Sequence, residues 1–429
     1  MFIPENIPSE NTDRIVSAMQ CFADLMIQME MTFRDHLDAG RLSRAVALAC
    51  DAEPVLGCRY VAGKRPFWER LDREDRNAFR IAVSETEYED FRNLSIETLV
   101  GPQILVCLLQ AEDGDRLLVK VAHEVADAGG VKDIVEVISR IYRELGVNPR
   151  FEPVPNLDGD RSANQLMKRI PLFSRPRIFM NYLRETWGVL VPPHGHSIPV
   201  TSRADDRKYF ITRTFEADAV EYLRRLGRKS GASLNDILMT AIIRAHASMG
   251  NWDGELPLRL WTTIDNRRYL QDRKTDGICN LSAVEIITIG NRIGSTFFDT
   301  LSMVAALSAR RKKSWLGLNT YIGLFPLMRL MSPDSIRNLM TYMTDYFTRA
   351  GIVQAALTNM GEISPERVKF DSLPVEAHML VPPVFPPLLG YGLSGYKGTL
   401  TLSAGVYHSS TQPETVSILA DRVISELHV

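Results

Sequence analysis

A histidine and an aspartate are separated by three residues in the segment His123–Glu124–Val125–Ala126–Asp127. Imidazole titrates near neutral pH, so this histidine could take the proton of an alcohol, amine or thiol that attacks an acyl carbonyl. The aspartate could hold a local turn or pair with an arginine. On its own the pattern more often marks a partly buried histidine at a strand end, so both interpretations stay open.

The flanking sequence predicts which elements would hold these two side chains. Two apolar runs flank AEDGD, in which Asp113-Gly114 is a favoured turn pair, and together they predict a hairpin over residues 103–121. Residues 131–145 carry apolar side chains at helical spacing. We therefore expect His123 at the end of a buried strand and Asp127 just before a core-facing helix.

The remaining pattern repeats one arrangement in both halves. Residues 27–34 alternate apolar and polar side chains, which predicts a half-buried strand after a helix that ends near residue 22. The second half opens with a strand at 208–215 and a helix at 218–230 closed by Gly231, and Ser233 and Asp236 suggest a capping box for the next helix. Further strands are expected at 256–265, 281–290, 351–361, 377–383 and 398–408, and helices at 295–313 and 413–427.

Bulk properties bound the class of protein. The 429 residues include 45% hydrophobic and 24% charged side chains with a net charge of −2, so nucleic acid is not expected as the main partner. The five cysteines form no CxxC pair and several lie among apolar residues, which predicts reduced, buried thiols. We find neither a secretory signal nor an apolar stretch of the roughly 20 residues a membrane span needs, and expect a cytoplasmic protein.

These elements predict an α+β fold built from two related units, each a sheet with helices. The Pro-rich stretch after residue 147 is the best candidate for the junction. We expect an N-terminal domain at 1–165, a crossover at 166–204 with some helix near 164–188, and a C-terminal domain at 205–429.

Four segments, in order, resemble the condensation-domain-like acyltransferases, which include condensation domains of nonribosomal peptide synthetases, polyketide-associated acyltransferases and wax ester synthases. Residues 26–60 resemble the opening strand–helix–strand, and LLVKVAHEVADAGG resembles the HHxxxDG region. WTTIDNRRYLQDRKTDGICNLSAVEI and ALTNMGEI resemble two second-domain segments. The resemblance covers nearly the whole chain and implies two chloramphenicol-acetyltransferase-like domains arranged in a V.

The resemblance also implies roles for individual residues. His123 would be the general base in a tunnel between the domains, and Asp127 would pair with Arg267 to hold the histidine loop. Gly129 and Gly130 would supply a backbone donor for the oxyanion, and Asn359 would belong to the oxyanion site or the tunnel loop. No metal or redox cofactor would be required.

The implied reaction moves an acyl group from a thioester to an alcohol or amine. The donor would carry coenzyme A or the phosphopantetheine of a carrier protein. The sequence departs from the family motif at Ala122 and Ala128, where relatives have His and Gly. A binding or assembly protein that kept the fold and lost the chemistry is therefore the alternative.

Three other motifs have weaker interpretations. His194 and His196 could form half a metal site, although a loop is the simpler interpretation. YGLSGYKG, at residues 391–398, lacks the spacing of a nucleophile elbow or a phosphate loop, and we interpret it as a turn and tunnel-lining loop. VPPVFPPLLG could cover a lipid-like substrate or form a stiff loop.

Overall fold

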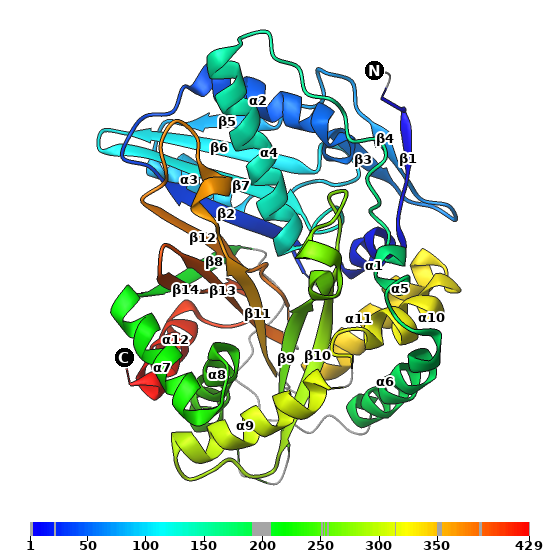
Figure 1. Ribbon diagram of the computed structural model, residues 1–429, viewed down its shortest axis with the longest axis vertical. Helices are drawn as coiled ribbons and strands as arrows, with labels where there is room; N and C mark the ends of the chain where they lie inside the picture. Colours follow the sequence, from blue (N-terminus) through cyan, green and yellow to red (C-terminus); the bar gives the residue numbers. More distant parts are fainter. Residues whose placement is uncertain are drawn as a thin grey trace.

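The computed structural model describes residues 3–20, 23–190, 207–249, 252, 254, 257–313, 315–349, 354–385 and 388–428. His194, His196 and residues 191–204 of the crossover that we predicted at 166–204 lie outside the part described. In Figure 1 the chain forms two lobes, with the first sheet in the upper lobe and the second in the lower. No helix in the described ranges is both long enough and apolar enough to cross a bilayer.

The upper lobe contains a five-stranded sheet and a small three-stranded sheet. The order of the larger sheet is β12-β2-β7-β6-β5, with bounds Glu376–Leu380, Met26–Thr32, Gly114–Ala122, Ile104–Ala111 and Phe79–Ala82. The small sheet has the order β1-β4-β3, with bounds Asn6–Pro8, Phe67–Arg70 and Cys58–Val61. Helices α2 (Ala39–Ala52) and α4 (Ala128–Val147) pack together over the larger sheet in Figure 1, and α3 (Glu85–Asn93) packs against β5 and β6.

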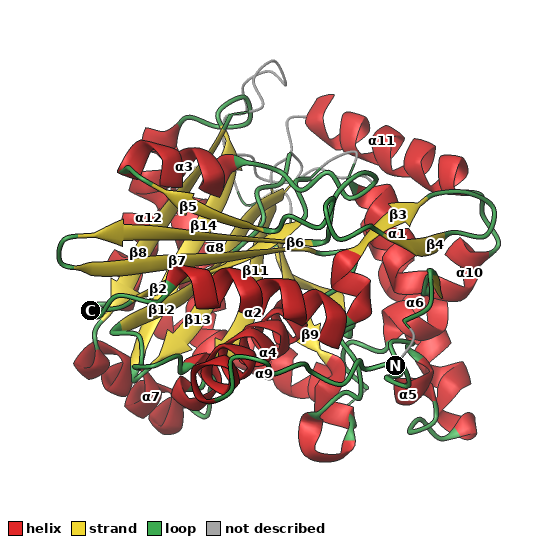
Figure 2. Cartoon of the chain, turned by 90° about the horizontal axis from the view of Figure 1, so that it is seen from above, coloured by secondary structure: helices red, strands yellow, loops and turns green. Residues whose placement is uncertain are grey.

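The lower lobe contains a six-stranded sheet in the order β10-β9-β11-β13-β14-β8. Its strands span Ser282–Gly290, Leu258–Asp265, Gln354–Glu362, Leu388–Tyr396, Thr399–Tyr407 and Lys208–Phe215. Helices α7 (Ala217–Ser230), α8 (Leu234–Met249), α9 (Phe297–Lys312) and α12 (Pro413–Leu427) form its helical layer. Helices α1, α5, α6, α10 and α11 span Asn11–Met19, Asn164–Met167, Arg175–Leu190, Phe325–Arg329 and Pro333–Arg349, and they gather on the right in Figure 2. The predicted two-part α+β fold is confirmed.

One strand of the second half belongs to the sheet of the first. β12 pairs antiparallel with β2, and Met379 lies opposite Met29. Both methionines are completely buried in the core of the upper lobe. The domain ranges predicted from sequence remain a prediction. They do not include the strand that the second half contributes to the first sheet.

The hairpin that leads to His123 is present, with one difference at its turn. Ala111 pairs with Gly114, so the two turn residues are Glu112 and Asp113 rather than Asp113 and Gly114. Gly114 has a φ of +131°, and a Cβ there would lie 2.0 Å from the carbonyl oxygen of Phe33. Glycine is therefore required at 114 both by its conformation and by this close approach.

Two sequence predictions were wrong in burial or in element type. Strand β2 is buried on both faces, because Gln28 and Glu30 interact with Arg92 where α3 covers the second face. The segment 391–398 is mostly strand β13, with a turn only at its end. Its glycines were misleading, because they permit close packing between strands: a Cβ on Gly392 would lie 2.6 Å from the Met360 side chain.

The predicted helix ends are largely confirmed. Gly231 ends α7 in the left-handed conformation with a φ of +67°. Ser233 and Asp236 bond reciprocally at the start of α8, as a capping box requires.

Four cysteines, at 50, 58, 107 and 279, are free and buried, as predicted for reduced thiols.

Candidate active site

His123 follows the last residue of β7, and both lobes contact it. Its backbone amide donates to the carbonyl of Leu25 at 2.8 Å, which fixes the loop beside β2. Its Nδ1 lies 3.0 Å from Oδ1 of Asn280, a residue of the second lobe. The imidazole is half-buried and lines a cavity.

The bonds of Asn280 determine which ring nitrogen of His123 is available as a base. The Nδ2 group of Asn280 donates to the carbonyls of His123, at 2.7 Å, and Glu124, at 3.1 Å. Its Oδ1 therefore acts as the acceptor toward the imidazole, so Nδ1 of neutral His123 carries the proton. Nε2 is then left with its lone pair, as a general base requires.

Asp127 is the cap residue of α4 and joins the two lobes. Its Oδ1 accepts from the amide of Gly130 at 3.0 Å, and its Oδ2 accepts from the amide of Leu281 at 2.7 Å. Nη1 of Arg267 donates to the same carboxylate at 2.8 Å, and both side chains are buried. The pairing of Asp127 with Arg267 that the resemblance implied is present.

The charge state of this pair follows from its surroundings. Burial by itself would raise the pKa of Asp127, but the charge of Arg267 and three hydrogen bonds lower it below the ordinary value. Burial likewise acts to lower the pKa of Arg267, and Asp127 more than offsets it, so the net direction is upward. The buried pair is ionised and crosses between the lobes beside the histidine loop.

The two glycines after Asp127 have a packing role. A Cβ on Gly129 would lie 2.6 Å from Nη1 of Arg267, and a Cβ on Gly130 would lie 2.9 Å from the Ala126 side chain. The amide of Gly130 already donates to Asp127, so in this structure it is not free to serve an oxyanion. Gly129 lines the cavity, and an oxyanion role for its amide remains a prediction.

The cavity at His123 is an apolar chamber of about 180 Å³ between the lobes. Its walls come from β2, the loop before α4, β9, β10, β11 and the segment that follows β12. Apolar side chains dominate these walls, among them Leu25, Ile27, Trp261, Val284, Leu357, Val381, Pro382, Val384 and Leu388. The segment predicted either to cover a lipid-like substrate or to form a stiff loop thus contributes part of the wall.

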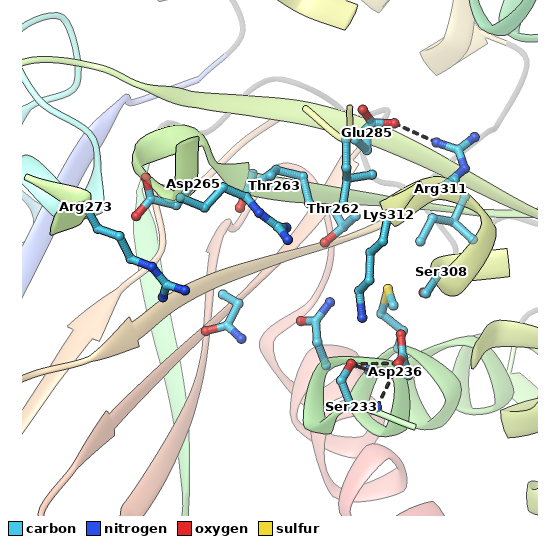
Figure 3. A pocket seen from close by; sticks show the side chains of 17 residues that line it. Ser233, Asp236, Thr262, Thr263, Asp265, Arg273, Glu285, Ser308, Arg311 and Lys312 are labelled. Carbon is cyan, nitrogen blue, oxygen red and sulfur yellow. Dashed lines mark hydrogen bonds and ion pairs between the residues drawn. The ribbon is translucent and has the colours of Figure 1, made fainter. Parts of the chain in front are cut away.

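A second, polar chamber of about 380 Å³ adjoins the first. Thr262, Thr263, Asp265 and Asn359 line both. Cationic side chains at 268, 273, 311 and 312 line the polar chamber, and Arg311 is paired with Glu285 at 2.6 Å. Figure 3 shows Lys312 directed toward the Ser233–Asp236 cap, with Arg273 on the other side of the chamber.

Asn359 lies at the boundary between the chambers. Its Oδ1 accepts from the amide of Gly361 at 2.9 Å, which orients the side-chain amide. The opposite end of that amide, Nδ2, is a hydrogen-bond donor. The structure therefore brings His123 and Asn359, predicted from distant segments, to the walls of one cavity.

The altered motif positions differ in their relation to the chamber. Ala122 is completely buried in a cluster under α3, on the opposite side of β7, and does not line the chamber. Ala128 begins α4 and lines the chamber. Relatives have a histidine where this chain has Ala122. This replacement therefore lies at a position that faces away from the cavity.

Sequence reasoning missed Asn280 and the state of Glu124. Asn280 was quoted within a resembling segment, but only the fold brings it to the ring of His123. Glu124 is completely buried and accepts from Gln20, and burial raises its pKa to about 8. The sequence offered one signal for Glu124, which is that it directly follows His123.

Comparison with solved structures assigns this architecture to the condensation-domain-like fold, with two chloramphenicol-acetyltransferase-like lobes. Trichothecene 15-O-acetyltransferase TRI3 from Fusarium sporotrichioides matches with a TM-score of 0.71 at 12% identity, over 98% of this chain and 95% of that one. The first condensation domain of the calcium-dependent antibiotic synthetase matches with a TM-score of 0.69 at 15% identity, over 99% and 96%. Polyketide synthase associated protein 5 from Mycobacterium tuberculosis matches with a TM-score of 0.65 at 16% identity, over 99% and 98%.

Sequence comparison adds one curated relative. Bacitracin synthase 3 from Bacillus licheniformis is 23% identical over 182 residues, which is 42% of this chain. The match spans only 3% of that protein. No family model matches the chain.

Proposed function

We propose that this protein is an acyltransferase that moves an acyl group from a thioester to an alcohol or amine. The observation that carries the proposal is the free Nε2 of His123 beside a chamber that both lobes line. The acetyltransferase and the condensation domain whose fold the chain shares support this proposal. The degenerate alternative is weakened because Ala122 faces away from the chamber.

The proposed reaction begins with removal of a proton. Nε2 of His123 takes the proton of the acceptor hydroxyl or amine as its oxygen or nitrogen bonds to the thioester carbon. The carbonyl oxygen becomes an oxyanion, for which Nδ2 of Asn359 and the amide of Gly129 are the proposed donors. When the carbon–sulfur bond breaks, the thiolate takes the proton from His123, leaving an ester or amide and a free thiol.

The two chambers suggest where each part of the donor binds. The apolar chamber would hold the acyl chain next to His123. The polar chamber would hold the phosphate-bearing arm, since phosphate is favoured by Arg and Lys side chains. Arg268, Arg273 and Lys312 form no ion pair within the described residues. Coenzyme A and the phosphopantetheine of a carrier protein share this chemistry.

Replacement of His123 tests the mechanism. His123→Ala should lower kcat/KM by about 100-fold or more while the fold persists, because one general base contributes about 10²–10⁴. Transfer would be followed by thiol release and by mass spectrometry of the acylated acceptor, with coenzyme A and carrier-protein thioesters as donors. His428→Asn, at an exposed position at the end of α12, is the matched control. A folded His123→Ala variant with full activity would reject the mechanism.

The donor assignment has its own test. Arg273→Ala with Lys312→Ala should raise KM for an acyl-coenzyme A about tenfold, because two phosphate-binding charges are lost. KM for the acyl-pantetheine, which lacks phosphate, should not change. The control is Arg310→Ala. It removes an exposed charge that lies on α9, as Lys312 does, but outside the chamber. Equal effects on both donors would contradict a phosphate role for these residues.

A further inference from the structure

Helix α6 and the turn before it carry their apolar side chains outward. Leu172 is 74% exposed and Phe173 84% exposed, and Met180 is 58% exposed. Among residues 175–184 of α6, whose side chains the structure describes, the exposed apolar residues are Pro176, Phe179, Met180 and Leu183, and their spacing places them on one stripe of the helix. An outward apolar stripe is the reverse of the usual surface helix.

The other side of α6 explains how the helix is held without this stripe. Ile178 is completely buried in a small core between α5 and β10. Tyr182 packs so closely on Gly323 that a Cβ there would lie 2.1 Å from its ring. The outward residues are therefore not needed for attachment to the lobe.

The charged side chains described in α6 and in the segment just before it are all basic. Residues 161–184 contain six basic side chains and no acidic one. Lys168, Arg169, Arg177 and Arg184 are exposed, and none of the four forms an ion pair within the described chain. On a helical projection Arg177 and Arg184 lie along one edge of the apolar stripe.

We propose that this surface docks the protein on an anionic lipid membrane. We define it as the α6 face: the apolar residues Leu172, Phe173, Phe179, Met180 and Leu183 with the cations Lys168, Arg169, Arg177 and Arg184. Apolar side chains that protrude beside unpaired cations suit the boundary between acyl chains and anionic headgroups. Figure 1 places α6 at the outer edge of the molecule, where a flat surface can reach it.

Lipid fits the α6 face better than a protein partner does. An exposed phenyl ring at 84% stands out from the surface rather than lining a recess. A membrane accepts such a ring by insertion, whereas a protein partner would need a matching pocket. The proposal stands independently of acyl transfer, because binding requires no substrate.

Vesicle co-sedimentation of the full chain tests the proposal. The protein should bind vesicles of phosphatidylcholine with 30% phosphatidylglycerol and bind pure phosphatidylcholine at least tenfold more weakly. Arg177→Glu with Arg184→Glu should lower the partition coefficient on anionic vesicles about tenfold or more, since each cation near the surface contributes several-fold. Phe173→Ser with Phe179→Ser should cause a comparable loss through the lost apolar insertion.

Two control pairs separate this face from general stickiness and charge. Arg224→Glu with Arg225→Glu reverses exposed charges on α7, and Val147→Ser with Val154→Ser removes exposed apolar groups elsewhere. Both controls should bind as the unmodified chain does. Absence of vesicle binding, loss in the α7 pair instead, or full binding by the serine pair at 173 and 179 would overturn the proposal. So would sedimentation velocity showing that the serine pair dissociates a dimer, because a second copy would then cover the face.

Discussion

At the scale of residues, the site depends on which atom of each polar side chain is already engaged. Asn280 uses Nδ2 on two carbonyls, so its Oδ1 fixes Nδ1–H of His123. Gly130 uses its amide on Asp127, so it cannot also serve an oxyanion. These assignments follow from counting donors and acceptors and distinguish a base from a bystander.

Asn280 is a positioning residue, and its replacement should alter the pH profile. Asn280→Leu removes the acceptor of Nδ1–H, so we expect kcat/KM to fall about tenfold or more as the ring loses its orientation. Asn280→Asp keeps an acceptor and adds a charge that favours protonated imidazole. Its pH profile of kcat/KM should therefore have an acid limb at higher pH. A purely structural role would lower activity in both variants without moving the limb.

At the scale of elements, one buried ion pair joins the start of α4 to the turn that follows β9. Asp127 caps α4, accepts from Leu281 just before β10, and pairs with Arg267. Removal of one partner from a buried pair leaves an uncompensated charge, at a cost of about 3–5 kcal/mol. The same pair shapes the histidine loop, so its loss should affect stability and activity together.

The pH dependence of stability provides a test of this pair. Because the pKa of Asp127 is lowered in the fold, its contribution is present above the unfolded pKa and is lost as pH falls through the folded one. In Arg267→Met the unpaired carboxyl should instead have a raised pKa, so that protonation relieves the fold. Urea unfolding should therefore show a gap to the unmodified chain of about 3–5 kcal/mol at pH 7 that narrows toward pH 4.

The control for that comparison is Arg228→Met. Arg228 pairs with Glu221 on the surface, where both side chains are largely exposed. Solvent screens such a pair, so little change in stability is expected at any pH. A gap for Arg267→Met that stays constant from pH 7 to pH 4 would contradict the role given to Asp127.

At the scale of the whole molecule, the second half of the chain contributes part of the first lobe. Phe370, Ala377 and Met379 from the second half lie in the core of the first lobe. The ring of Phe370 contacts Phe33, at 5.6 Å between centroids, and Tyr142, at 5.3 Å. The chamber at His123 lies between two lobes that are linked by this shared core.

Phe370 belongs to the second half of the chain, but its ring is buried in the core of the upper lobe. Loss of the ring should therefore weaken the upper lobe rather than the lower one. Phe370→Ala should lower the free energy of unfolding by about 3–5 kcal/mol, since the ring is completely buried. Hydrogen exchange should increase in β2 and α4. Phe298→Ala, which removes a ring that is 54% exposed, should change stability little. Faster hydrogen exchange confined to the lower lobe would contradict the placement of Phe370 in the core of the upper lobe.

The sequence alone determined the elements that depend on local patterns. The hairpin into His123, a helix after Asp127, the end of α7 at Gly231 and the box at Ser233 were all predicted, because turn chemistry and periodicity act within a few residues. Resemblance to a family supplied the partner of Asp127 and the chloramphenicol-acetyltransferase-like form of the two units. Local patterns failed where packing decided the outcome: Gln28 and Glu30 are buried by α3, and glycines in β13 permit neighbouring strands to approach.

The tertiary structure alone decided the rest. No local signal could pair β12 with β2 or bring Asn280 to His123, because each contact joins residues more than 100 positions apart in the chain. The outward apolar stripe of α6 has the same periodicity as an inward one, so sequence cannot tell which side packs. Burial and contact are properties of the folded whole, and only they show what a side chain is free to do.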